Sequence, residues 1–271
     1  MLVRISDLAD PRIADYHDIG DAGRLTARGL FVAEGRLVVR RAIELHGPAV
    51  RSLLVNEAAR RSLEPWLARL PEAVPVFACA TADFLRITGY DIHRGCLALV
   101  ERPPALSIVD FLARVDRAAG GITTIVVLER VTNADNVGGV FRNAAAFGAA
   151  GIVLDPDTAD PWYRKAIRTS MAAILRVPFA RLESWPDGLD ALRQAGFRIA
   201  ALTPREPSTA LDEFADSRPS RVALMVGTEG EGLTAAAEGA ADDRVRIPID
   251  SAVDSLNLAV AVGIALHRLA S

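Results

Sequence analysis

The sequence predicts an α/β protein with a mostly parallel sheet in its C-terminal half, and two observations support this prediction. Residues 123–128 form a β-branched and aliphatic run of the kind found in strands that are buried on both faces. Further short apolar runs alternate with segments of helical spacing, and this alternation is typical of parallel strands joined by crossover helices. Apolar residues make up 51% of the 271-residue chain, which is sufficient for a substantial core.

The first third of the chain predicts a separate small α/β domain, residues 1–104. Two prolines at 103 and 104 forbid regular strand pairing and place its boundary. A linker over 105–121 follows, in which Ser107 is the expected N-cap of a helix that runs to Arg117. The expected strands of this domain cover 50–55, 74–78 and 95–100, and the expected helices cover 36–46, 57–70 and a short segment capped by Thr81.

The second domain, residues 122–271, alternates strands and helices to its end. Its expected strands cover 123–128, 151–154, a short segment near Val177, 198–202 and 222–226. Its expected helices cover 136–147, 161–173, 186–195 and 255–270. Parallel sheets bind ligands beyond the carboxyl ends of their strands, so the loops after these strands are the first places to search for a site.

Composition and charge limit the function classes. A net charge of −3 argues against a bulk nucleic-acid binder, so any nucleic-acid contact has to come from local basic segments. Two segments qualify: 24–41 has five arginines and one acid, and 164–181 has five basic residues and no acid. A solvated charged face explains either segment taken alone.

The same composition indicates compartment and cofactor chemistry. The most apolar stretch, 256–266, is too short to span a bilayer, and the N-terminus lacks the apolar run of a signal peptide, so we expect a cytoplasmic protein without a membrane partner. The cysteines at 79 and 96 lie in apolar runs and are expected to be reduced and buried. No histidine or cysteine has metal-ligand spacing, so we predict no metal.

Three loops that follow strands hold the candidate chemistry. The first, 133–143, carries Asn136 and Arg142 with two glycines between them, which let a backbone approach closely. A helix N-cap at Asp135 or Asn136 and a surface arginine explain the same residues without any ligand. The first loop alone leaves both interpretations open.

The second loop, 225–233, contains three glycines, and the third combines 246–249 with 254–257. A dinucleotide-binding phosphate loop is the rival interpretation of the second loop, but the glycine order differs and too few residues follow for the rest of that fold. Ser255 and Asn257 open the last expected helix. Helix capping is therefore their simplest role, and capping is compatible with a ligand contact.

Together the three loops resemble the knotted SpoU (TrmH-like) family of RNA 2′-O-ribose methyltransferases, within the SPOUT class. The family patterns Asn-x-Gly-x-x-x-Arg and Gly-x-Glu-x-x-Gly are matched by Asn136, Gly138, Arg142, Gly227, Glu229 and Gly232. The pattern Ile-Pro followed by Ser-Leu-Asn is matched by Ile247, Pro248, Ser255, Leu256 and Asn257. Ala259 stands where many relatives have serine. The first domain resembles the family's substrate-binding extension, which is similar to the RNA-binding domain of kink-turn-binding ribosomal proteins.

The resemblance implies a C-terminal parallel-sheet domain with a deep trefoil knot over about residues 222–271, preceded by a small α/β RNA-binding domain. The knot would form the pocket for the cofactor S-adenosylmethionine. The cofactor-binding residues that it implies are Thr203, Gly227, Ile247, Pro248, Ile249 and Leu256. The catalytic residues that it implies are Asn136, Arg142, Glu229, Ser255 and Asn257.

The implied reaction transfers a methyl group to a ribose 2′-hydroxyl of RNA, with rRNA favoured over tRNA because of the N-terminal extension. The family proposal gives the proton-accepting role to the arginine at position 142. A guanidinium stays protonated to above pH ~12, so we prefer a clamp on the adjacent phosphate that stabilises the oxyanion, although the sequence does not decide between the two roles. The expected RNA contacts are Arg142, Arg164, Lys165, Arg168, Arg36 and Arg40.

Relatives of this fold work as homodimers, and the apolar residues around Gly263 fit a helix covered on several sides, either by a second copy or inside the knot. Two other functions stay open at this point. One is a non-catalytic RNA-binding protein that keeps the fold, which the intact motif residues argue against. The other is a nucleotide-dependent enzyme that uses the glycines of loop 225–233 for phosphates.

Overall fold

The computed structural model describes residues 2–17, 19, 21–89, 95–118 and 121–270. The chain folds into two compact units. The first unit comprises 1–104 together with 161–175, and the second comprises 105–160 together with 176–271. The division differs from the predicted domains in two segments: 161–175, which we expected in the second domain, and 105–121, which we expected as a linker and which falls in the second unit. Residues 119–120 of the expected linker lie outside the described residues.

The first unit is built on a five-stranded sheet in the order β1-β4-β3-β5-β2. β5 is antiparallel to β3 and β2, whereas β1, β4 and β3 run parallel. The strands are β1 (Leu2–Arg4), β2 (Leu30–Glu34), β3 (Val50–Val55), β4 (Val76–Ala78) and β5 (Cys96–Glu101). The helices are η1 (Pro11–Tyr16), α1 (Ala22–Ala27), α2 (Arg36–His46), η2 (Gly47–Ala49), α3 (Glu57–Leu67), α4 (Thr81–Thr88), α7 (Arg164–Thr169) and η3 (Ala173–Leu175). Thr81 is the first residue of α4 rather than its cap, because Ala80 occupies the capping position.

Segment 161–175 belongs to the first unit because its side chains pack against β2. The Trp162 ring stacks on Phe31 with the ring centroids 4.8 Å apart. Arg164 Nη1 donates to Glu34 Oε2 at 2.7 Å, and both side chains are largely buried. The helix expected over 161–173 is shorter in the structure because the chain turns after α7, where two non-glycine residues, Met171 and Ala172, have φ of 52° and 66°.

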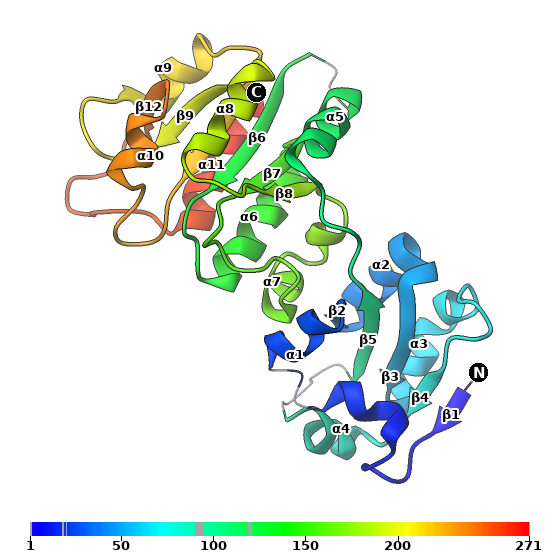
Figure 1. Cartoon of the computed structure of the whole chain (residues 1–271). Helices are drawn as coiled ribbons and strands as arrows, with labels where there is room; N and C mark the ends of the chain where they lie inside the picture. The colour runs from blue at the N-terminus through cyan, green and yellow to red at the C-terminus, as the bar shows by residue number, and fades with distance from the viewer. Residues whose placement is uncertain (1, 18, 20, 90–94, 119–120, 271) are drawn as a thin grey trace. The chain divides into compact units, whose positions relative to one another are not determined.

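The second unit is built on a seven-stranded sheet in the order β10-β12-β9-β11-β6-β7-β8, and each pairing between these strands is parallel, as predicted (Figure 1). The strands are β6 (Thr123–Leu128), β7 (Gly151–Leu154), β8 (Phe179–Arg181), β9 (Arg198–Leu202), β10 (Thr209–Ala210), β11 (Arg221–Val226) and β12 (Asp243–Arg246). The helices are α5 (Ile108–Ala118), α6 (Ala134–Ala146), η4 (Asp187–Leu189), α8 (Asp190–Gln194), α9 (Leu211–Asp216), α10 (Ala235–Gly239) and α11 (Leu258–Ala270).

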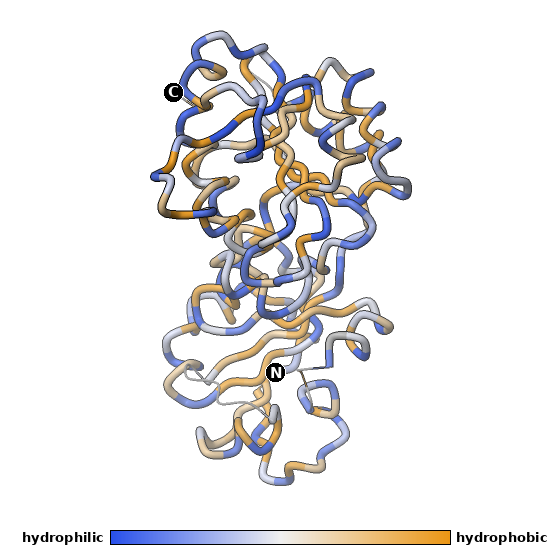
Figure 2. Tube along the Cα trace, turned by 90° about the vertical axis from the view of Figure 1, so that its left-hand side faces the viewer, coloured by the Kyte–Doolittle hydropathy of each residue, from blue (hydrophilic) through white to orange (hydrophobic). Residues whose placement is uncertain are grey.

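The centre of this sheet is buried on both faces and brings three strand ends together. β7 and β11 are buried almost throughout. Figure 2 colours the chain by hydropathy and shows hydrophobic stretches in the middle of the unit. β11 lies between β6 and β9, with Val226 level with Leu128 and Met225 level with Ala201. The carboxyl ends of β6, β9 and β11 therefore meet at one edge of the sheet, and the three candidate loops gather there.

Helices α6 and α11 pack against each other through small residues. A Cβ atom placed on Gly139 would lie 2.7 Å from the Ala259 Cβ, and one on Gly263 would lie 3.1 Å from Asn143 Nδ2. Asn143 Nδ2 donates to the Ala259 carbonyl at 2.5 Å. The alanine at 259 therefore lies where the facing helix leaves room for only a small side chain. Neither α11 nor any other helix among the described residues is long and apolar enough to cross a membrane.

Candidate functional site

A cavity of about 690 Å³ lies at the carboxyl ends of β9 and β11. Its wall is made by the turn after β9, the loop after β11 and the chain that leads from β12 into α11. Aliphatic side chains alternate in this wall with glycine backbone and a few polar groups. The lining residues are Leu202, Thr203, Pro204, Arg205, Val226, Gly227, Thr228, Glu229, Gly230, Glu231, Gly232, Leu233, Ile247, Ile249, Asp254, Ser255, Leu256, Asn257, Leu258 and Ala261.

Residues 227–233, which we call the glycine loop, fold back on themselves against the cavity. A Cβ atom on Gly227 would lie 2.2 Å from the Gly232 carbonyl carbon and 2.4 Å from the Leu233 nitrogen. The Gly232 N–H donates to the Thr228 carbonyl at 3.0 Å and closes the loop. Gly230 and Gly232 have φ of 87° and 72°, a conformation that favours glycine. The loop can hold this shape only because no side chain stands at position 227.

Three of the predicted site residues form one hydrogen-bonded group beside the cavity. Asn257 Oδ1 accepts from the N–H groups of Ala259 (3.0 Å) and Val260 (3.3 Å), so it caps α11. This fixes the direction of Asn257 Nδ2, which donates to Asn136 Oδ1 (3.1 Å) and Glu229 Oε1 (2.8 Å). Asn136 is buried, and its Nδ2 has no hydrogen-bond partner within the described part of the chain. It is therefore a donor available to a bound molecule.

The capping interpretation of Asp135 and Asn136 is wrong for this helix. Asn133 is the N-cap of α6, and its Oδ1 accepts from the Asp135 N–H at 3.0 Å. Asn136 points instead toward Asn257. Arg142 follows it by six residues, which is roughly 240° further around the helix, so the two side chains leave α6 on different sides. Arg142 is exposed and is not among the residues that line the cavity.

The predicted cofactor-binding residues lie in or next to the cavity wall. Gly227, Ile247, Ile249 and Leu256 line it, as does Thr203. The Thr203 hydroxyl donates to the carboxylate of Glu238 at 3.0 Å and accepts from a backbone N–H at 3.2 Å, so it is occupied within the wall. Pro248 is not a lining residue, although both of its neighbours are. Ser255, expected to act with Asn257, lines the cavity as well.

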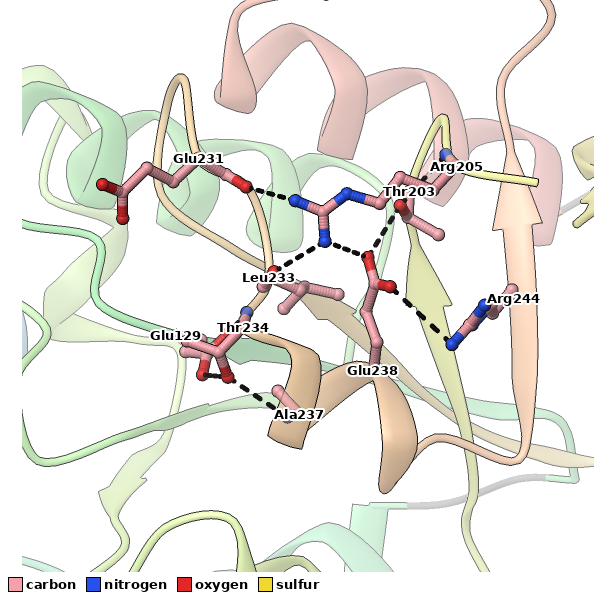
Figure 3. Close-up of polar contacts among 9 residues, drawn as sticks. All are labelled: Glu129, Thr203, Arg205, Glu231, Leu233, Thr234, Ala237, Glu238 and Arg244. Carbon is pink, nitrogen blue, oxygen red and sulfur yellow. Dashed lines mark hydrogen bonds and ion pairs between the residues drawn. The ribbon is translucent and has the colours of Figure 1, made fainter. Parts of the chain in front are cut away.

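Figure 3 shows a polar cluster beside the glycine loop that the sequence did not predict. It contains two buried acids, Glu129 at the end of β6 and Glu238 in α10. Their partners come from segments that are distant in sequence: the turn after β9, β12, the N-cap of α10 and the loop that contains Trp185. The one signal available beforehand was Thr234, a threonine in front of alanine-rich helix formers, and it does cap α10 by accepting from the Ala237 N–H at 3.1 Å.

The basic residues predicted to contact RNA in segment 161–175 have different environments. Arg164 is paired with Glu34 and its side chain is 12% exposed. Arg168 lies 3.7 Å from the other oxygen of Glu34, but half of its side chain is exposed. Lys165 is exposed as well. Two of the three basic side chains therefore present charge to solvent.

The two predicted arginines of α2 also differ. Arg36 is half-buried, whereas Arg40 is exposed. Arg40 Nε donates to Glu44 at 2.9 Å, four residues on, and its guanidinium lies 4.9 Å from the centre of the Trp66 ring. An ion pair of this kind on a helix surface is weak and leaves the arginine able to contact an anion.

Cysteine and metal chemistry were also assigned from the sequence. Cys79 and Cys96 are buried and outside any disulfide, as predicted, and burial raises the pKa of the Cys79 thiol to about 12. Within residues 2–17, 19, 21–89, 95–118 and 121–270, no three His, Cys, Asp or Glu side chains are grouped so that they could hold a metal ion.

The fold and the cavity together define a class of protein. An all-parallel sheet with a cavity at its carboxyl edge, walled by glycine backbone and aliphatic side chains, is typical of α/β proteins that bind a nucleoside-like ligand. Residues 123–267, which hold all three candidate loops, match the model of the SpoU rRNA methylase family. The chain belongs to this family, as the three sequence motifs predicted.

Curated relatives cover nearly the whole chain. Proteins named as uncharacterized tRNA/rRNA methyltransferases of Mycobacterium bovis and of Mycobacterium tuberculosis (strain CDC 1551) are each 37% identical to it over 269 residues. The matched region is 97% of this chain and 90% of each relative. The likeness therefore includes the first unit as well as the second.

Solved structures share the fold over the same extent. An rRNA methyltransferase from Sinorhizobium meliloti, solved with bound AdoMet, superposes with a TM-score of 0.82 at 24% identity, covering 99% of this chain and 97% of that one. The SpoU methyltransferase AviRb from Streptomyces viridochromogenes, in complex with AdoMet, gives a TM-score of 0.77 at 24% identity, covering 96% and 98%. Both likenesses support the fold described above.

Proposed function

We propose that this protein is an RNA methyltransferase that transfers a methyl group from S-adenosylmethionine to a ribose 2′-hydroxyl. The observation that carries the proposal is the joining of Asn136, Glu229 and Asn257 by hydrogen bonds at the edge of the cavity. These residues come from three separate family motifs. Membership of the SpoU rRNA methylase family and the names of the curated relatives support methyl transfer to RNA.

S-adenosylmethionine is the cofactor, and the residues present fit it. The cavity of about 690 Å³ lies within the range of ligand pockets, about 300–1,000 Å³. Leu202, Val226, Ile247 and Leu256 offer apolar walls for a nucleoside and a thioether arm, and the glycine loop offers backbone groups at close range. When bound, the cofactor supplies an activated methyl group. The protein then has to orient the ribose, and the proton that the 2′-hydroxyl loses on methylation would pass to solvent.

Arg142 is the residue that we assign to the RNA backbone next to the reacting ribose. Its guanidinium is exposed and its geometry suits a phosphodiester, which it can bind through two N–H groups at once. In that position it stabilises negative charge that develops on the 2′-oxygen. A guanidinium stays protonated to above pH ~12. Binding of the RNA phosphate is therefore a better explanation for the role of Arg142 than acceptance of a proton.

The amide and carboxylate group organises the other side of the reacting ribose. Asn257 is held by its helix cap and in turn holds Asn136 and Glu229. The buried Nδ2 of Asn136 then presents a donor in one fixed direction, which suits a ribose oxygen. Ser255 in the cavity wall adds a hydroxyl that can donate or accept. Because the attacking atom is a 2′-hydroxyl, DNA is not a substrate.

Several finer features belong to the same proposal. We expect rRNA rather than tRNA as the substrate, bound through Arg36, Arg40, Lys165 and Arg168 of the first unit. The burial of Arg164 against Glu34 supports a structural role for that residue instead.

We also propose the trefoil knot over residues 222–271 and a homodimer. The contacts of Asn257 with both α6 and the glycine loop support a C-terminal segment that returns to the centre of the sheet. Val260 and Ile264 lie one helical turn apart on α11 and are 51% and 41% exposed, which supports a surface covered by a second copy.

Methyl transfer from labelled S-adenosylmethionine to RNA from cells that lack the modification, followed by nucleoside analysis, tests the proposal. We expect label in a 2′-O-methylnucleoside with the wild type and with Arg114→Ala, an exposed arginine on α5 away from the motifs. Arg142→Ala should lose transfer and keep its affinity for the cofactor. Label on a base would refute ribose methylation. Cofactor binding without label on any RNA would favour the non-catalytic RNA-binding protein.

A further inference from the structure

Two side chains of the glycine loop have partners outside it: Asn257 Nδ2 donates to Glu229 Oε1 at 2.8 Å, and Arg130 Nη1 lies 3.5 Å from Glu231 Oε2. The closing hydrogen bond of the loop, from the Gly232 N–H to the Thr228 carbonyl, lies inside the loop. Glycines at 227, 230 and 232 add conformational freedom, which has an entropic cost when the loop is ordered. A loop of this composition needs support from outside if it is to keep the shape that lines the cavity.

Arg205 supplies that support from the turn after β9. Its Nη2 donates to the Glu231 carbonyl at 2.9 Å, and its Nη1 donates to the Leu233 carbonyl at 3.2 Å (Figure 3). One planar guanidinium thus bridges two carbonyl groups of the glycine loop. The turn after β9 and the loop after β11 are both walls of the cavity, so Arg205 ties one wall to the other.

Glu238 fixes the position of this guanidinium. The side chain of Glu238 is 6% exposed, and its Oε1 accepts from Arg205 Nη1 (3.1 Å) and from the Thr203 hydroxyl (3.0 Å). Arg244 Nη2 lies 3.8 Å from the second oxygen, Oε2. The carboxylate is therefore held by three side chains, of which only Arg205 reaches the glycine loop.

The end of the loop is anchored independently of Arg205. Glu129 is buried and accepts from the Thr234 N–H at 2.8 Å and the Thr234 hydroxyl at 2.6 Å. The Trp185 indole N–H donates to the same carboxylate at 2.7 Å. Removal of Arg205 would therefore free the backbone carbonyls of Glu231 and Leu233, while the start of α10 stays in place and Asn257 still binds the side chain of Glu229.

We propose that Arg205 is a positioning residue for S-adenosylmethionine binding, which it serves by holding the glycine loop in its cavity-lining conformation. The inference rests on the proposed cofactor function. It assigns Arg205 no part in methyl transfer. Its guanidinium acts on the carbonyls of Glu231 and Leu233, and Glu238 keeps it aimed at them.

The first test is titration calorimetry of S-adenosylmethionine with the full chain. Arg205→Ala should raise the dissociation constant about tenfold, equivalent to about 1.4 kcal/mol, because a binding-competent loop is then only a minor population. Arg205→Lys keeps the charge beside Glu238 but lacks the planar fork, so about a threefold rise is expected. At saturating cofactor, the transfer rate of Arg205→Ala should stay within about twofold of the wild type.

Arg244→Ala is the matched control, because Arg244 pairs with the same carboxylate and does not touch the loop. We expect its dissociation constant to stay within about twofold of the wild type. An equal rise in both alanine variants would show that the charge balance at Glu238 matters rather than the loop contact. An unchanged dissociation constant in Arg205→Ala would overturn the proposal outright.

Amide hydrogen exchange without cofactor gives an independent readout. Peptides that cover 227–234 should exchange about tenfold faster in Arg205→Ala than in the wild type or Arg244→Ala, while β6 and β7 keep their protection. Unchanged exchange in this loop would refute the positioning role. If the wild type did not bind S-adenosylmethionine at all, the proposed function would fail, and the exchange data would still decide whether Arg205 holds the loop.

Discussion

Gly227→Ala tests whether the shape of the glycine loop controls cofactor binding. The new methyl group would lie 2.2–2.4 Å from backbone atoms of Gly232 and Leu233, which no side-chain rotation relieves. Overpacking of this kind costs ~1–3 kcal/mol. An open loop would not have this clash, so the population of the closed, cavity-lining conformation should fall by about 5- to 150-fold. The dissociation constant for S-adenosylmethionine should rise by the same factor.

Titration calorimetry measures this factor directly, and Gly239→Ala is the control. A Cβ atom on Gly239, the last residue of α10, would meet nothing within 4 Å, so the same substitution there should leave the affinity unchanged. Circular dichroism melts of both variants show whether the effect is local. A Gly227→Ala protein that binds S-adenosylmethionine with wild-type affinity would show that the loop does not form the pocket.

Two further predictions follow from side chains described above. Asn257→Ala should lose the cap of α11, at a cost of about 1 kcal/mol in the free energy of unfolding, together with methyl transfer. Asn257→Asp keeps a capping oxygen but loses the donor to Asn136 and Glu229, and its carboxylate faces that of Glu229. Denaturant titration should therefore show a stability between those of the wild type and Asn257→Ala, while transfer is lost; active Asn257→Asp protein would contradict the assigned role. Because burial raises the pKa of Cys79 to about 12, its thiolate fraction at pH 8 is about one in ten thousand, and a thiol reagent should leave Cys79 and the buried Cys96 unmodified until urea is added. Rapid modification of the native protein would show that these thiols are accessible.

The sequence predicted the strands whose own apolar residues are sufficient to make them strands. The strands at 50–55, 123–128, 151–154 and 198–202 have the predicted bounds because their apolar runs are buried whatever surrounds them. The short strands β2 and β12 were not predicted, since their residues become strands only by pairing with β5 and β9. Pairing between distant segments leaves little trace in local composition.

The start of the last helix shows the same limit. The spacing predicted a helix from 255, but α11 begins at Leu258, because 255–257 line the cavity and Asn257 turns its side chain back as a cap. The motifs located most of the candidate site. They did not locate Arg205 or Glu238, since a guanidinium that bridges two loop carbonyls depends on the spatial meeting of β9, β11 and α10.

The place of segment 161–175 has a consequence for how the protein is made on the ribosome. Most of the first unit has been synthesised once the ribosome passes residue 104. The contact partners of Phe31 and Glu34, which are Trp162 and Arg164, are synthesised only later. At about 5–20 residues per second, the ribosome needs roughly 4–14 seconds to reach residue 175. The nascent N-terminal sheet therefore leaves β2 partly uncovered during that interval, so its folding is completed only after β6 and β7 of the second unit have also been translated.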